Sequence, residues 1–144
     1  MINRALLFEA KAFLCWEKFD QLSIKLIPIT GTVAFFYPPT EDIATINLFY
    51  KSETEDFGQS LCLLFHEAGH YQQWRQWSNQ DKEREFWNLL NIDKGAEKIA
   101  FEREAWDLGG RLLDEFIERL AANHDDLRDA YDKLAQQSIL TYHD

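Results

Sequence analysis

The residues best suited to chemistry lie in the segment His66-Glu67-Ala68-Gly69-His70. Two histidines four residues apart lie on one face of an α-helix, one turn apart, so both imidazoles can bind one metal ion. Glu67 projects about 100° round the helix from His66, near such a metal but outside its ligand set. The spacing therefore predicts a metal-binding helix. The alternative is a structural role, with one histidine buried and hydrogen-bonded.

A third ligand is predicted on a later helix, over residues 96–122. Glu102 is the only acidic residue in an apolar stripe that also contains Ala105 and Gly109, two small residues that would let this helix approach the histidine helix closely. A buried carboxylate needs a partner, and a metal would supply it. Two histidines and one carboxylate leave a fourth zinc position open, as in catalytic sites. Glu104 is the rival ligand, and an Arg or His in the core is the rival partner for Glu102.

The surrounding pattern predicts an α+β fold. Apolar residues at helical spacing indicate helices over residues 3–18, 58–77, 96–122 and 125–139, with a short helix between the second and third. Residues 22–26, 32–37 and 44–50 read as strands of a small antiparallel three-stranded sheet, a meander packed against the helices. Because the second strand runs into Pro38-Pro39, we place it at an edge of the sheet.

Composition restricts the function classes. The chain of 144 residues is expected to form one domain, residues 1–144, and its net charge of −10 argues against binding nucleic acid. Cys15 and Cys62 are too few and too far apart for a disulfide framework. We find no signal peptide and no membrane-spanning stretch, so we expect a soluble, cytoplasmic protein without a membrane partner. The pattern does not indicate an oligomeric state.

The chain resembles a known family at His66-Glu67-Ala68-Gly69-His70 and at Glu102-Arg103-Glu104-Ala105. Both motifs are similar to those of the gluzincin zinc metallopeptidases, most of all the minigluzincins and the ImmA/IrrE-type peptidases. The resemblance implies a zincin-like fold with a zinc ion held by His66, His70 and Glu102, and Glu67 as general base. It also implies that the edge strand aligns an extended polypeptide substrate, through Val33, Ala34, Phe35 and Phe36.

The chain departs from that family at Trp106. The family's ligand glutamate often has an Asp or Asn four residues later, which supports a ligand histidine, and Trp106 occupies that position here. The residue that would stabilise the oxyanion is not identified by the sequence. Its candidates are Tyr71, His124, Tyr131 and His143.

The sequence thus favours a zinc-dependent endopeptidase in which Glu67 accepts a proton from water. The alternative is a catalytically silent domain that binds a polypeptide partner in the same cleft. A third hypothesis is a toxin- or antitoxin-like interaction partner, but no specific residue of the sequence supports it.

Overall fold

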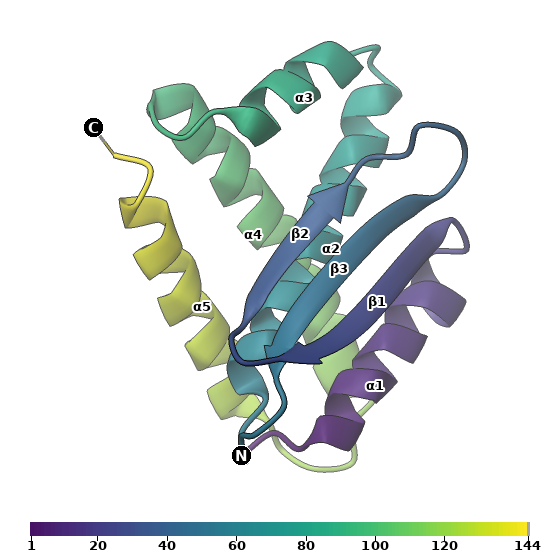
Figure 1. Cartoon of the computed structure of the whole chain (residues 1–144), viewed down its shortest axis with the longest axis vertical. Helices are drawn as coiled ribbons and strands as arrows, with labels where there is room; N and C mark the ends of the chain where they lie inside the picture. Colours follow the sequence, from purple (N-terminus) through teal and green to yellow (C-terminus); the bar gives the residue numbers. More distant parts are fainter. Residues whose placement is uncertain (144) are drawn as a thin grey trace.

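The chain folds as an α+β structure in which a three-stranded sheet packs against helices (Figure 1). The computed structural model describes residues 1–143. The elements in chain order are α1 (Arg4–Ala12), a π-helical segment (Phe13–Lys18), β1 (Leu22–Ile29), β2 (Val33–Tyr37), β3 (Ala44–Lys51), α2 (Gly58–Ser78), α3 (Glu83–Asn91), α4 (Ala96–Glu118) and α5 (Asp125–Leu140). In the described part of the chain, no helix combines the length and apolarity needed to cross a bilayer.

The sheet is mixed, so the prediction of an antiparallel meander is wrong. Its strand order is β1-β3-β2, with β1 parallel to β3 and β2 antiparallel to β3. Strand β3 lies between β1 and β2. Its side chains at alternate positions are all buried: Ala44, Ile46, Leu48 and Tyr50. A strand with one fully apolar face is best covered in the middle of the sheet.

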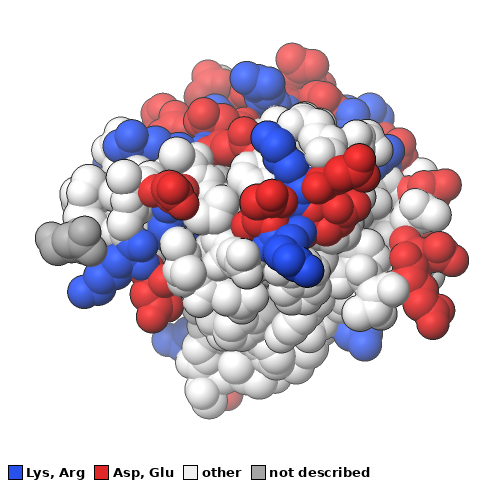
Figure 2. Space-filling view, turned by 90° about the horizontal axis from the view of Figure 1, so that it is seen from above, with Lys and Arg blue, Asp and Glu red and all other residues white. Residues whose placement is uncertain are grey.

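The prediction that the second strand is an edge strand is confirmed. Only β3 pairs with β2, so one side of β2 has free backbone groups. Side chains on its outer face are exposed: Val33 by 41%, Phe35 by 45% and Tyr37 by 47%. In Figure 2 the lower middle of the visible face is largely uncharged, and charged side chains gather above it and at its sides.

Helix α2 lies between the sheet and the helices α4 and α5 (Figure 1). The predicted apolar stripe, which includes Leu61, Leu64 and Phe65, is fully buried. The histidine face is buried as well, with His66 exposed by 5% and His70 by 2%. The two histidines therefore lie between helices and sheet, where an unsatisfied polar atom is costly.

Helices α2 and α4 pack closely at two glycines, which confirms the prediction made from Ala105 and Gly109. A Cβ on Gly69 would lie 2.0 Å from the carbonyl oxygen of Ala105, and a Cβ on Gly109 would lie 2.3 Å from that of Phe65. Neither distance is sterically allowed, so only glycine fits at both positions. This close approach brings Glu102 on α4 to the histidines on α2.

Asp56 anchors the start of α2 to the N-terminal segment. Its Oδ1 accepts from the backbone N–H groups of Ile2 and Gly58, both at 3.0 Å. The backbone N–H of Phe57 also donates to the carbonyl of Ile2 at 2.8 Å. The hydrogen bond from Ile2 contributes most to lowering the pKa of Asp56 below its usual value, although burial opposes the shift.

Asp56→Ala removes the acceptor of two backbone N–H groups. It is expected to lower the free energy of unfolding by about 1 kcal/mol, the usual net contribution of a hydrogen bond. Because the pKa of Asp56 is lowered by folding, its contribution is present above pH 3.8 and is lost as the pH falls through the lowered value. Urea unfolding at pH 7 and at acidic pH measures both effects, with Glu55→Ala as the exposed control. A variant as stable as wild type at pH 7 would refute the anchor.

Candidate metal centre

The structure brings the three predicted ligands together. The Oε2 atom of Glu102 lies 2.6 Å from Nε2 of His70 and 3.7 Å from Nε2 of His66. One ligand atom from each residue can be chosen so that all three lie within 4.8 Å of one another, and all three residues are buried. Two imidazoles and a carboxylate in this arrangement can hold a metal ion.

His70 is oriented by Gln73, one turn further along α2. The Nε2 of Gln73 donates to the carbonyl of Phe101 and to Oε1 of Glu104, both at 2.9 Å. These two acceptors fix the amide, so its Oε1 must face Nδ1 of His70 at 2.9 Å. Nδ1 of His70 therefore carries a proton. Its Nε2 is then the ring nitrogen available to a metal.

Two lone pairs consequently face each other across the site. With its proton on Nδ1, a neutral His70 presents a bare Nε2 to Oε2 of Glu102 at 2.6 Å. A contact this short is a hydrogen bond, which requires a second proton on His70. A metal ion bound by both atoms would take the place of that proton, with the two atoms moving slightly apart. Burial opposes charging His70, but the charge of Glu102 and its hydrogen bond outweigh burial and raise the pKa of His70. The same site is thus suited to a cation.

His66 is held by stacking. Its ring lies against the indole of Trp106 at 3.9 Å between centroids, with 16° between the planes. Its Nδ1 has no hydrogen-bond partner among residues 1–143. Burial, reinforced by the nearby His70, lowers the pKa of His66 to about 3, so its imidazole is neutral and can donate a lone pair. Trp106, where the resembled family often has Asp or Asn, therefore positions His66 through its ring face.

Glu67 lies beside the two histidines on α2 and is exposed by only 8%. Burial raises the pKa of its carboxyl to about 8, and Glu102 acts in the same direction, while the charge of His70 lowers it. A cation bound at the neighbouring histidines would lower this pKa further. Glu67 is thus a carboxylate whose proton affinity depends on what the site holds.

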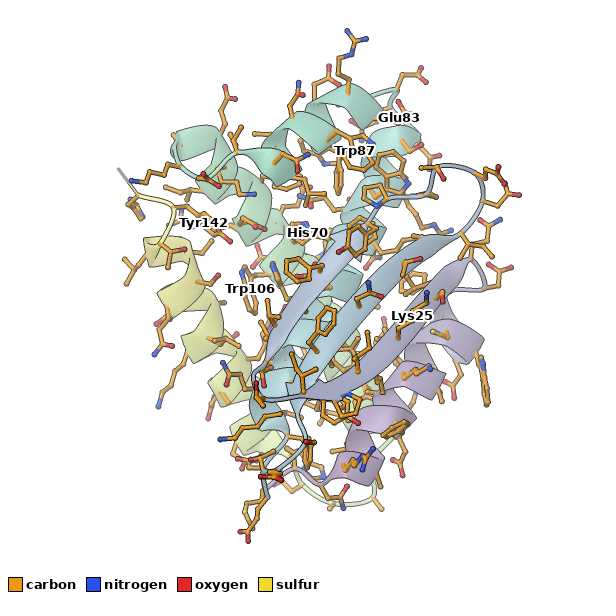
Figure 3. All side chains as sticks on the ribbon, in the orientation of Figure 1. Lys25, His70, Glu83, Trp87, Trp106 and Tyr142 are labelled. Atoms are coloured by element: carbon orange, nitrogen blue, oxygen red, sulfur yellow. The ribbon has the colours of Figure 1, made fainter. Side chains whose placement is uncertain are left out.

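The site opens into a cleft of about 780 Å³. Its lining includes His66, Glu67, His70 and Glu102 together with the predicted substrate-binding residues Val33, Ala34, Phe35 and Phe36. The strand that carries these four residues, β2, forms one wall. Trp87 and Leu90 of α3, with Ile92 directly after it, contribute to another. In Figure 3, His70 on α2 and Trp106 on α4 lie beside β2, and Tyr142, from the segment after α5, lies further from the sheet, next to the end of α5.

Glu104, the rival ligand, does not belong to the cluster that His66, His70 and Glu102 form. Its Oε1 accepts from Gln73 and, at 2.8 Å, from Nε1 of Trp77. Glu104 therefore supports His70 through Gln73.

The oxyanion candidates do not line the cleft. Tyr71 packs against Phe19, and the buried Tyr131 donates to the carbonyl of Trp106 at 2.6 Å. His124 precedes α5, and His143 lines a separate surface pocket.

Three residues of the site were not predicted. Gln73 lies three residues after His70, and Lys98 lies four residues before Glu102, so helical spacing could have identified both. Tyr142, whose hydroxyl donates to Oε1 of Glu102 at 3.0 Å, lies 40 residues away in sequence. No local pattern marks a contact of that range.

Comparison with protein-family models, with curated proteins and with solved structures finds no match to the chain.

Gln73→Leu is expected to lower the affinity for zinc about 10- to 100-fold, because His70 loses the acceptor that fixes its proton on Nδ1. Calorimetric titration with zinc would measure the change. Gln76→Leu, an exposed substitution on the same helix, is the matched control. Equal affinities for the two variants would show that Gln73 does not orient His70.

Proposed function

We propose that the chain is a zinc-dependent peptidase that hydrolyses peptide bonds within polypeptides. The observation that carries the proposal is the opposition of Nε2 of His70 and Oε2 of Glu102 at 2.6 Å, with the His70 proton held on the far nitrogen by Gln73. His66 adds a neutral imidazole to the same point. This donor set suits zinc, and three protein ligands leave one coordination position for water or substrate.

His66, His70 and Glu102 would hold the ion. A zinc ion there would supply Lewis acidity and lower the pKa of a water molecule. Glu67 would act as the general base, and its place in the cleft lining beside the proposed ligands supports this role. Its carboxylate would accept the proton of the attacking water and return it to the leaving amine. Burial keeps this carboxylate away from bulk water and so preserves its basicity.

The free edge of β2 is proposed to bind the substrate. An extended polypeptide can pair with the unpaired backbone groups of an edge strand, with alternate side chains entering pockets. The edge at Val33–Phe36 borders the cleft that contains Glu67 and the proposed ligands. A strand added there would pass the reacting groups, which favours a polypeptide over a compact small molecule.

The test is cleavage of an unfolded protein such as casein by the purified chain. Activity is expected with zinc, loss of activity with 1,10-phenanthroline, and recovery when zinc is added back. A zinc-loaded chain that cleaves neither casein nor a mixed peptide library would contradict the peptidase proposal.

One observation favours the alternative of a catalytically silent polypeptide-binding domain. The Nδ1 atom of His66 has no acceptor among residues 1–143, whereas ligand histidines in metal sites almost always donate their second N–H to one. A chain that binds zinc and captures peptides from the same library without cleaving them would support this function.

A further inference from the structure

The two oxygens of Glu102 are in different environments. Oε2 faces Nε2 of His70 and Nε2 of His66, at 2.6 Å and 3.7 Å. Oε1 faces the other way, where it accepts from the hydroxyl of Tyr142 at 3.0 Å and lies 3.5 Å from Nζ of Lys98. The carboxylate thus presents one oxygen to the proposed metal and the other to two fixed donors.

Lys98 is held by two hydrogen bonds and one ion pair. It is exposed by only 4%, and its ammonium donates to the carbonyls of Leu89 at 2.8 Å and Leu90 at 3.2 Å, in the last turn of α3. The ion pair joins the ammonium to Oε1 of Glu102, at 3.5 Å. An ammonium has three protons, and the two carbonyls accept two of them. Lys98 therefore cannot turn away from Glu102 without leaving carbonyls of α3 unpaired.

Tyr142 is held in place through both its backbone and its ring. The carbonyl of Tyr142 accepts from the backbone N–H of Gly95 at 3.0 Å, next to the start of α4. Nζ of Lys98 lies 5.4 Å from the centroid of the Tyr142 ring, within the range of a cation–π interaction. The segment after α5 and the connection between α3 and α4 thus hold each other in place beside Glu102.

We propose that Lys98 and Tyr142 are positioning residues that restrict Glu102 to metal binding through one oxygen. This inference rests on the proposed metal centre. A carboxylate can bind a metal through one or both of its oxygens. Binding through both would occupy the coordination position needed by water or substrate. By occupying Oε1, the lysine and the tyrosine keep that position open.

The test compares zinc coordination in the wild type and in the double variant Lys98→Met/Tyr142→Phe, by X-ray absorption at the zinc edge. The expected result is a rise from about four to about five nitrogen and oxygen ligands, because Oε1 is released to the metal. With Co²⁺ in place of zinc, the same change is expected to weaken the visible absorption, which follows coordination geometry. A double variant with the wild-type coordination number and spectrum overturns the proposal.

Tyr142→Phe alone keeps the proposal testable if loss of the buried Lys98 prevents folding. It removes one hydroxyl, keeps the ring and the backbone contact with Gly95, and is expected to lower zinc affinity about tenfold and to weaken the Co²⁺ absorption. Tyr37→Phe, on the exposed face of β2, is the control and should change neither. Tyr142→Phe with wild-type affinity and absorption overturns the proposal. A wild type that takes up no zinc instead contradicts the metal centre itself.

Discussion

Glu67→Gln is expected to retain zinc and to lower kcat/KM for peptide cleavage about 10²- to 10⁴-fold, the usual contribution of a general base. The amide keeps the size of the side chain but cannot accept the proton of water at neutral pH. Steady-state cleavage of a fluorogenic peptide, measured with zinc content on the same samples, checks both halves of the prediction. A variant that retains zinc and at least half of wild-type activity would exclude Glu67 as the base.

The burial of Glu67 can be tested separately with the same variant, by measuring stability in the presence of a chelator that removes any metal. Folding raises the pKa of Glu67 from its usual 4.5 to about 8, chiefly through burial. Between these values the folded chain binds a proton that the unfolded chain has lost, so this group makes stability fall as the pH rises. Glu67→Gln should abolish that decline. Urea unfolding at pH 5 and pH 8 would detect it, and an unchanged slope would show that Glu67 is not buried as described.

Gly69→Ala is expected to abolish zinc binding and to lower the free energy of unfolding by about 3 kcal/mol, the upper end of the cost of overpacking a core. The added Cβ would lie 2.0 Å from the carbonyl oxygen of Ala105 and 2.7 Å from the backbone N of Gly109. Because both atoms belong to the backbone of α4, the helices themselves have to separate. Glu102 would then move away from the two histidines.

Calorimetric zinc titration and urea unfolding measure the two effects of Gly69→Ala. Gly31→Ala is the matched control, since a Cβ there meets nothing within 4 Å. It should stay within about 0.5 kcal/mol of wild type. If Gly69→Ala binds zinc as tightly as wild type does, close packing of α2 and α4 is not what positions Glu102.

Much of the site could be predicted because its residues share helical spacing. His66 and His70 are one turn apart, and Glu102 interrupts an apolar stripe, which distinguished it from Glu104. Gln73 and Lys98 obey the same spacing relative to His70 and Glu102 but were missed, because glutamine and lysine are common on solvent-facing sides of helices. Tyr142 depends on tertiary packing alone.

The sheet topology was harder to predict than the helices. Consecutive strands usually pair with each other, and Thr30-Gly31 resembles a hairpin turn, which favoured a meander. In the structure β3 separates β1 from β2, and the N–H of Ala44 donates to the carbonyl of Gln21 at the start of the parallel pair. Placing β3 in the middle of the sheet buries its alternating apolar side chains. The free energy gained by this burial outweighs the preference of Thr30-Gly31 for a hairpin turn. Pro38-Pro39 still identified β2 as an edge.

Zinc titration of the chelator-treated wild type, Glu102→Gln and Glu104→Gln tests the central claim most directly. We predict that the wild type binds about one zinc per chain. Glu102→Gln should bind zinc at least about 100-fold more weakly, which exceeds the usual cost of losing a residue that only supports a ligand. Glu104→Gln should bind zinc with nearly wild-type affinity. The glutamine oxygen in Glu104→Gln can still accept from Gln73 and Trp77. A wild type that binds no zinc, or a larger loss for Glu104→Gln than for Glu102→Gln, would contradict a metal centre built from His66, His70 and Glu102.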